Sequence, residues 1–288
     1  MKSAKQKTAS KVDKTQPDTI NIQTSDNINE SKLPSKSAAI HQRILREGNK
    51  EMNRNASALL ISAIAAGLTV SSSMIAKALL QAALPHFPYI HLIASFGYTV
   101  GFVLVILAKQ QLFTENTVTA VLPVMTRPKS RNFMRLGRLW GLVLLGNLIG
   151  TFLMALALVK LPAFSPEVKS AFIDLGQKVM QNSAWAMFCK GIFAGWLIAT
   201  LVWILANIKY GQFIVIVLIT YIIALGDFTH IVVGSTEIFY LFLTGNITFI
   251  DILYPFAIPT LLGNIVGGTL IFSLLSHIEI RSDMGDFN

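Results

Sequence analysis

The sequence predicts an all-α integral membrane protein with six transmembrane helices in two inverted three-helix repeats, and three observations carry this prediction. Of the 288 residues, 53% are hydrophobic and only 14% are charged, against about 25% charged in a soluble domain. The apolar residues form six long runs, and one motif occurs in each half. The composition excludes a soluble enzyme, and a single cysteine excludes a disulfide scaffold or a cysteine metal cluster.

The N-terminal region is polar and divides into two predicted parts. Residues 1–35 lack apolar periodicity and are rich in Ser, Thr, Asn, Gln and Lys, which predicts a disordered cytoplasmic tail. Residues 36–55 place Ile40, Ile44 and Leu45 among Arg and Glu residues, which predicts a short amphipathic cytoplasmic helix. Two interpretations of this helix stay open: a solvated lead-in, or a helix that contacts the membrane surface.

The remainder of the chain contains six apolar runs that approach the roughly 20 residues that a transmembrane helix needs. The runs are 56–84, 88–108, 139–159, 191–208, 210–226 and 252–278. They predict a channel domain over residues 56–278, followed by a cytoplasmic C-terminal tail over 279–288. An even number of spans places both termini on the same side of the membrane.

Basic residues predict which side that is, because loops on the cytoplasmic side carry an excess of Lys and Arg. With the termini in the cytoplasm, the inner segments hold 18 Lys and Arg, whereas the short outer loops hold only Lys169 and Lys178. Five of the inner residues fall in one predicted loop, 127–138: Arg127, Lys129, Arg131, Arg135 and Arg138. The +9 net charge therefore indicates membrane orientation and not a nucleic-acid partner.

Two of the six segments are too long to cross the bilayer as one helix. Residues 88–125 would extend roughly 57 Å as a helix, against a hydrocarbon core of roughly 30 Å. The middle of this segment, residues 109–116, is polar, and residues 211–245 show the same excess length around a polar stretch at 226–230. Irregular polar backbone at membrane depth has to line a cavity or be buried in protein. We therefore expect both helices to be broken at these stretches.

A repeated motif relates the two broken helices. Residues 144–150 read LLGNLIG and residues 261–267 read LLGNIVG, on predicted helices three and six. Three spans in each half place the halves in opposite orientations, and broken helices at matching positions of inverted halves indicate a transport site. Close helix packing explains the glycines. Asn147 and Asn264, in contrast, need polar partners, which the backbone of a broken helix would supply.

Four motifs in register with the predicted breaks resemble those of the formate/nitrite transporter family, and the resemblance covers residues 56–277. In chain order they are Leu112-Phe113-Thr114, Lys190-Gly191-Ile192, Phe228-x-His230 and Pro259-x-x-x-Gly263-Asn264-Ile265-x-Gly267-Gly268. The stretch Phe113-Thr114-Glu115-Asn116 is most similar to a branch of this family from bacterial inner membranes. The resemblance implies an aquaporin-like fold and a homopentamer with one pore in each subunit. It also implies an inner (plasma) membrane location and passage of small monovalent anions such as formate or nitrite, often with a proton.

The resemblance further implies roles for individual residues. Leu112, Phe113 and Thr114 would lie in a loop beside the pore constriction, and His230 would be the central pore histidine. Constriction side chains would be Tyr98, Phe102, Ile198 and Ile223. We expect polar support for the pore from Asn147, Asn264, Lys109, Glu115 and Lys190.

The chemistry of a weak-acid anion gives His230 a role that does not depend on the family. Carrying an anion through an apolar constriction costs a large desolvation energy, which neutralisation by a proton removes. Histidine is the side chain that titrates nearest to physiological pH. We expect His230 to hydrogen-bond the anion and to be able to protonate it, while Thr114 donates its hydroxyl. The alternative is a structural histidine that bonds a loop carbonyl.

Several charged residues lie in or near the predicted spans, and each allows two interpretations. Lys77, Lys160 and Lys190 near the outer ends either snorkel to the surface or form a positive vestibule that attracts anions. Lys109 and Glu115 either form an ion pair or act as a charged gate. Asp227 and Glu237 also need partners, which the sequence does not identify.

Three classes of function remain open at this stage. The favoured class is an anion channel or transporter for formate, nitrite or a similar weak-acid anion that is linked to proton movement. The alternatives are a pore for small neutral solutes and a non-conducting membrane scaffold. An intramembrane enzyme is disfavoured because the sequence offers no assembled nucleophile and base. We expect no cofactor, no metal ion and no nucleic acid, and the lipid bilayer as a constant partner.

Overall fold

The computed structural model describes residues 35–84 and 88–285, and the regular secondary structure of these segments is all helix. The tail predicted over residues 1–35 lies, apart from Ser35, outside the described residues. Five helical stretches are long and apolar enough to span a membrane by length and composition: Ala56–Ala83, Ile90–Leu107, Ser130–Lys160, Ala184–Asn207 and Phe249–Ser282. Two shorter apolar helices are Gln212–Leu225 and Ile231–Leu243.

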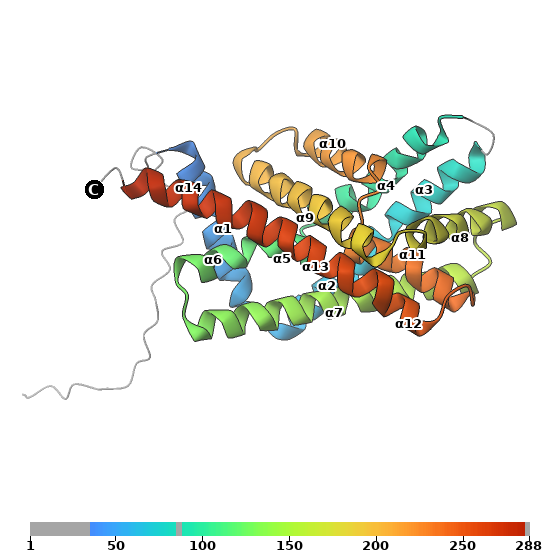
Figure 1. Cartoon of the computed structure of the whole chain (residues 1–288), viewed down its shortest axis with the longest axis horizontal. Coiled ribbons are helices and arrows are strands. Elements are labelled where there is room, and N and C mark those ends of the chain that lie inside the picture. The colour runs from blue at the N-terminus through green and yellow to red at the C-terminus, as the bar shows by residue number, and fades with distance from the viewer. Residues whose placement is uncertain (1–34, 85–87, 286–288) are drawn as a thin grey trace, which may run out of the picture.

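The helices in chain order show how each long stretch is built (Figure 1). The first half contains α1 (Lys36–Met52), α2 (Ala56–Val70), α3 (Ser72–Ala83), α4 (Ile90–Leu107), α5 (Phe113–Thr119), α6 (Val121–Thr126) and α7 (Ser130–Lys160). The second half contains α8 (Pro166–Met180), α9 (Ala184–Asn207), α10 (Gln212–Leu225), α11 (Ile231–Leu243) and α12 (Phe249–Asp251). It ends with η2 (Ile252–Ala257), α13 (Ile258–Ile265), η3 (Val266–Ser273) and α14 (Leu274–Gly285).

Helix α1 packs its apolar face on the rest of the protein. It begins at Ser35, whose hydroxyl accepts a hydrogen bond from the Ala38 backbone N–H at 3.2 Å. Ile40 and Ile44 are buried in a cluster with Val118 and Leu122, which belong to α5 and α6. The amphipathic pattern seen in the sequence therefore serves a protein contact along this face.

Close packing at glycines joins the long helices in pairs. A Cβ atom on Gly150 of α7 would collide with the backbone of α2 near Gly67. A Cβ atom on Gly263 of α13 would collide with the backbone of α9 near Gly191. Small residues let membrane helices approach this closely. The packing interpretation of the glycines in the repeated motif is thus confirmed at both copies.

The structure corrects two predicted boundaries. Residues 127–138 are not a loop, because α7 already begins at Ser130 and carries Arg131, Arg135 and Arg138 on its first turns. Arg, Leu and Met favour helix, so this basic segment extends the apolar helix that follows it. The C-terminal tail predicted over 279–288 is likewise helical as far as Gly285, at the end of α14.

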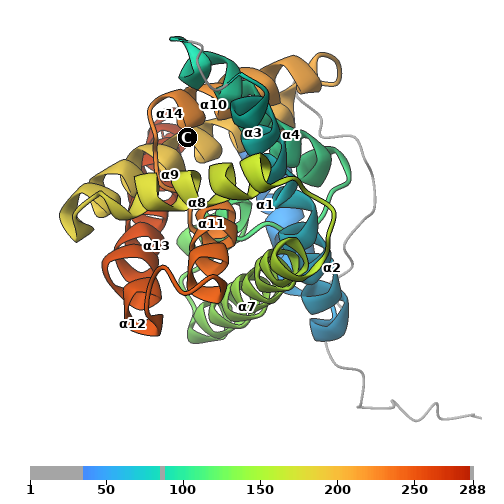
Figure 2. The ribbon, with the colours of Figure 1, turned by 90° about the vertical axis from the view of Figure 1, so that its right-hand side faces the viewer.

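The two ends of the molecule are built differently. Helices α1 and α14 lie near each other at one end, where His41 and His277 meet at 3.3 Å (Figure 1). Helix α8 lies across the opposite end, which faces the viewer in Figure 2. This helix packs on α3 and α11. It thereby covers the region in which the candidate site opens.

Candidate functional site

Two interruptions of the helical chain bring the candidate site together. The first separates α4, which ends at Leu107, from α5, and the second separates α10, which ends at Leu225, from α11. Each interruption contains one non-glycine residue in the left-handed region, Lys109 with φ 51° and Asp227 with φ 49°. The backbone therefore turns in the same way at two residues that are 118 positions apart in the sequence.

The turns are also alike in their hydrogen bonds. After α4, the N–H of Gln110 donates to the carbonyl of Val105 at 3.1 Å. After α10, the N–H of Phe228 donates to the carbonyl of Ile223 at 3.0 Å. Such six-to-one bonds after a left-handed residue are the usual way to satisfy the last carbonyls of a helix. Glycine, the usual residue at the left-handed position, is replaced there by Lys109 in one turn and by Asp227 in the other, so the sequence gives no glycine signal for either helix end.

The asparagines of the repeated motif hold the two interruptions in place. The Asn147 side chain accepts from the Phe113 N–H at 2.9 Å and donates to the carbonyls of Ala63 and Gln111 at 2.9 and 2.8 Å. Because its side chain is fully buried, each of these bonds replaces a contact with water. Asn147 therefore ties α7 to α2 and to the first interruption.

Asn264 makes the corresponding set of contacts in the other half. It accepts from the Ile231 N–H at 2.9 Å and donates to the carbonyls of Gly191 and Thr229 at 2.9 and 3.0 Å. Like Asn147, it satisfies the first free N–H of the helix that follows the break. The partners expected for both asparagines are thus present in the irregular backbone.

A histidine–threonine contact joins the two interruptions to each other. His230 Nε2 lies 2.8 Å from the Thr114 hydroxyl, and its Nδ1 accepts a hydrogen bond from the Val233 N–H at 3.3 Å, which caps α11. Since Nδ1 accepts, we assign the ring proton to Nε2, which then donates to Thr114. This assignment leaves the hydroxyl proton of Thr114 free for another acceptor. Both side chains are buried.

The other residues predicted at the constriction surround this contact to different extents. Tyr98 and Phe102 have ring centroids 5.3 Å apart, and the Phe102 ring meets the His230 ring edge-on at 5.2 Å. Four further predicted residues, Leu112, Phe113, Ile198 and Ile223, are buried in the same apolar core. The Phe113 ring packs on Trp140 at 5.7 Å.

A cavity of about 180 Å³ reaches His230 from the α8 end of the molecule. Among the residues predicted for the pore, its walls include Tyr98, Ile223, His230 and Lys190. They do not include Thr114, so the cavity ends at the imidazole. This volume accommodates a few water molecules or one small solute.

Charged groups line this cavity, and most of them have partners. The Lys178 ammonium bonds both carboxylate oxygens of Asp227 at 2.9 and 2.7 Å, and His91 Nε2 lies 4.0 Å from the same carboxylate. Lys190 donates to Asn182 at 2.7 Å. Its position in the wall agrees with the vestibule interpretation of this lysine, whereas the side chain of Lys160 is exposed at the end of α7.

The suggested ion pair between Lys109 and Glu115 is wrong: neither residue forms an ion pair within the described part of the chain. Lys109 occupies the turn that closes α4, and its side chain is exposed. Glu115 stands instead in the first turn of α5, where the positive end of the helix dipole favours a carboxylate. The turn between the two helices separates the charges.

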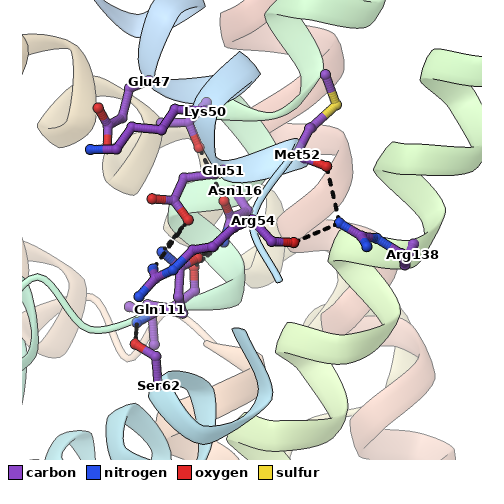
Figure 3. A network of polar contacts seen from close by, with 11 residues as sticks. Glu47, Lys50, Glu51, Met52, Arg54, Ser62, Gln111, Asn116 and Arg138 are labelled. Carbon is purple, nitrogen blue, oxygen red and sulfur yellow. Dashed lines mark hydrogen bonds and ion pairs between the residues drawn. The ribbon is translucent and has the colours of Figure 1, made fainter. Parts of the chain in front are cut away.

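A polar network attaches α1 to the first interruption on the other side of the site (Figure 3). The Gln111 side chain donates to the Glu51 carboxylate at 2.9 Å, and the same carboxylate oxygen lies 3.3 Å from Arg54 Nη1. Asn116 donates to the Gln111 side-chain oxygen at 3.2 Å. Arg138 adds bonds to the carbonyls of Met52 and Arg54 at 3.1 and 2.9 Å. The sequence pattern does not predict this network, and its one signal is Gln111 in the polar stretch where the helix is expected to break.

Membrane-length apolar helices that enclose a buried polar contact beside a cavity define a membrane channel or transporter. The chain belongs to the formate/nitrite transporter family, because the family model described as "Formate/nitrite transporter" matches residues 38–278. It is therefore a multi-pass membrane transporter or channel and not an enzyme.

Curated relatives and solved structures agree with this assignment. The chain is 52% identical over 259 residues to "Inner membrane protein YfdC" of Escherichia coli (strain K12), covering 90% of this chain and 84% of that protein. It is 28% identical over 193 residues to "Uncharacterized transporter YrhG" of Bacillus subtilis (strain 168), covering 65% and 71%.

Two solved structures share the fold. One is a "Pentameric formate channel with formate bound", with a TM-score of 0.67, 19% identity, and coverage of 77% of this chain and 96% of that one. The other is an "FNT family ion channel", with a TM-score of 0.72, 20% identity, and coverage of 84% and 98%. At these identities the comparisons establish the fold.

Proposed function

We propose that the protein conducts small monovalent weak-acid anions, of the formate or nitrite type, together with a proton. The observation that carries the proposal is the buried Thr114–His230 contact, 2.8 Å long, at the inner end of a cavity. The Thr114 hydroxyl receives the imidazole N–H and keeps its own proton, which it can donate to an anion in an otherwise apolar surrounding. The formate channel of similar fold supports the choice of substrate class.

The apolar residues around this contact require that the anion cross in a neutral form. Phe102, Ile198 and Leu112 are fully buried around the site and offer no compensation for a charge. An unpaired charge in such a place costs several kcal/mol. A weak acid avoids the cost by crossing with its proton, whereas a strong-acid anion such as chloride cannot.

We infer that the membrane-embedded part consists of two inverted halves of three spans each, with spans two and five broken. The matching turns at Lys109 and Asp227 and the matching bonds of Asn147 and Asn264 support the repeat. The excess of basic residues on the side of α1 supports cytoplasmic termini. The inner-membrane relative supports a bacterial inner membrane, and the pentameric channel of similar fold supports a homopentamer.

The test is transport by the purified full-length protein in liposomes, with formate, nitrite and acetate offered across a pH gradient. We expect anion-dependent acidification of the lumen in the wild type. His230→Phe removes both the N–H donor and the cap of α11, and we expect it to abolish this acidification. His230→Asn retains a capping side chain and keeps a well-formed α11 while losing the imidazole, so it separates folding from function. Unchanged acidification in both variants would contradict the role of His230.

A pore for small neutral solutes is the second candidate, and one observation favours it. Both ring nitrogens of His230 already have partners, which suits an uncharged imidazole that only shapes the lumen. Glycerol-driven swelling of the same liposomes separates the two proposals. Swelling without any response to formate or nitrite would favour the neutral pore.

A further inference from the structure

We propose that Glu237, assisted by Lys77, is the group that gives the permeating weak acid its proton, in the cavity before the constriction. The inference rests on the proposed function and names the proton donor for it. In this proposal His230 is a neutral hydrogen-bonding group and does not donate the proton.

The cavity presents Glu237 and His230 along one face of α11. His230, Gly234 and Glu237 all line the cavity, and their spacing of four and three residues places them in a row on the same side of a helix. Seven residues correspond to a rise of roughly 10 Å, or two turns. A solute that enters from the α8 end therefore reaches the carboxyl before the imidazole, and the glycine between them makes room for the ring of Phe256 in the wall.

Glu237 and Lys77 are the charged groups of this cavity without a bonding partner. Their side chains are 5% and 8% exposed. Neither has a hydrogen bond or an ion pair within 4.0 Å in the described part of the chain, and the Lys77 ammonium lies 5.9 Å from the centre of the Tyr98 ring. Their polar atoms are not among the fully enclosed ones and therefore reach the space of the cavity. Ionisable groups in such a place mark functional sites in membrane proteins.

The hydrogen bonds of His230 argue against the imidazole as the donor. Its Nδ1 accepts the Val233 N–H that caps α11, so a second ring proton would remove this bond and place two donors against each other. The remaining ring proton is directed at Thr114. The Glu237 carboxyl, two turns away along the same wall, has no such hydrogen bond in the described part of the chain, so it can gain or lose a proton without breaking one.

Proton transfer between two carboxyl groups changes the free energy little, because donor and acceptor hold a proton about equally well. The protonated Glu237 carboxyl gives its proton to the carboxylate of the entering anion, which leaves a Glu237 carboxylate and a neutral acid. Carboxyl groups commonly ionise near pH 4, about 2 units below imidazole, so donor and acceptor are matched. The Lys77 ammonium favours whichever carboxylate carries the charge. Water at the mouth of the cavity returns a proton to Glu237 for the next cycle.

Other charged groups around Glu237 come from several elements. Lys77 belongs to α3, Lys178 to α8, Lys190 to α9, and Asp227 to the second interruption, and all four line the cavity. The segments η2 and α10 contribute apolar walls such as Phe256 and Ile223. Helices α2 and α13 contain no titratable residue, and the lysine of α7 nearest this end, Lys160, is exposed. Since Lys178 and Asp227 pair with each other, Lys77 dominates the field at Glu237.

The test compares Glu237→Gln with the wild type in liposomes, with acetate as the probe. The rate of acidification of the lumen after an acetate jump is measured, together with the midpoint of thermal unfolding of each purified variant. Glutamine has the shape of glutamate but cannot exchange a proton. We expect acidification to fall at least tenfold while the unfolding midpoint stays that of the wild type, and Glu237→Asp to restore part of the acidification. Glu167→Gln on α8 is the matched control, since Glu167 is outside the cavity, and we expect wild-type rates from it.

Infrared difference spectra of the purified protein on acetate addition give a readout that does not depend on transport. With acetate carrying ¹³C in its carboxyl group, whose own bands are shifted away, we expect the wild type to lose the band of a protonated protein carboxyl group, and Glu237→Gln to lack this change. Wild-type acidification by Glu237→Gln, or a loss of acidification that comes with a lowered unfolding midpoint, overturns the assignment of Glu237 alone. A wild type that transports no weak acid overturns the proposed function, and a wild type that also shows no acetate-induced carboxyl change overturns both.

Discussion

At the scale of single residues, the two asparagines show how an apolar bundle tolerates irregular backbone. Asn147 and Asn264 each bond three backbone groups, and each accepts from the first N–H of a helix that would otherwise lack a partner. A buried group without a partner costs about 1–3 kcal/mol. The asparagines therefore act as fixed points for the interruptions and, through them, for the contact between Thr114 and His230.

Replacing either asparagine by alanine is expected to destabilise the protein by about 3 kcal/mol or more, because several buried polar groups lose their partner at once. The loss is measured by the midpoint of thermal or denaturant-induced unfolding in detergent. Asn49→Ala is the matched control, since Asn49 bonds only the Leu45 carbonyl on an exposed face of α1. A midpoint for Asn147→Ala equal to that of Asn49→Ala would contradict the fixed-point role.

At the scale of helices, α1 is attached to the first interruption by polar contacts, and its histidine makes this attachment sensitive to pH. Burial, followed by the neighbouring His277, lowers the pKa of His41 from 6.5 to about 4. A base with a lowered pKa binds its proton more readily when α1 is undocked. The contribution of His41 to the free energy of docking α1 is therefore fully present above pH 6.5, and it is lost as the pH falls from 6.5 towards about 4.

Hydrogen exchange of the α1 amides measures this effect. We expect exchange in Lys36–Met52 to increase on acidification from pH 7.5 to 5, after correction for the intrinsic pH dependence of exchange. His41→Gln carries no titrating ring and is expected to remove most of the increase. Exchange that rises equally in this variant would assign the effect to another group, such as His277, whose Nδ1 lies 3.3 Å from His41 Nε2.

Sequence reasoning predicted these elements unevenly, for physical reasons. The long apolar runs, the two breaks and the need of the asparagines for partners follow from the cost of polar groups in lipid, which local sequence displays. The network of Glu51, Gln111 and Arg54 could not be predicted, because it joins segments sixty residues apart through ordinary surface residue types. The ion pair between Lys109 and Glu115, one of the two interpretations left open, is wrong, because closeness in sequence does not show in which direction side chains on either side of a turn extend.

At the scale of the whole molecule, every group of the candidate site comes from one chain. Thr114 belongs to the first half and His230 to the second, while Lys77 and Glu237 face the same cavity from α3 and α11. The outside of this bundle carries many exposed apolar side chains, among them Leu145, Phe193 and Leu262. These faces suit lipid or neighbouring subunits, and under the proposed function the pathway lies within each subunit.

A complete pathway in each subunit predicts how mixed oligomers behave. If wild-type and His230→Phe chains are co-expressed in known ratios and reconstituted, each wild-type chain keeps its own pathway. Anion-linked acidification should then fall in direct proportion to the wild-type fraction. A pathway shared between subunits would instead be blocked by a single altered chain, and acidification would fall far more steeply at low fractions of the variant. Native mass spectrometry of the same samples, with 31.6 kDa per chain, reports whether five copies assemble and how the two kinds mix.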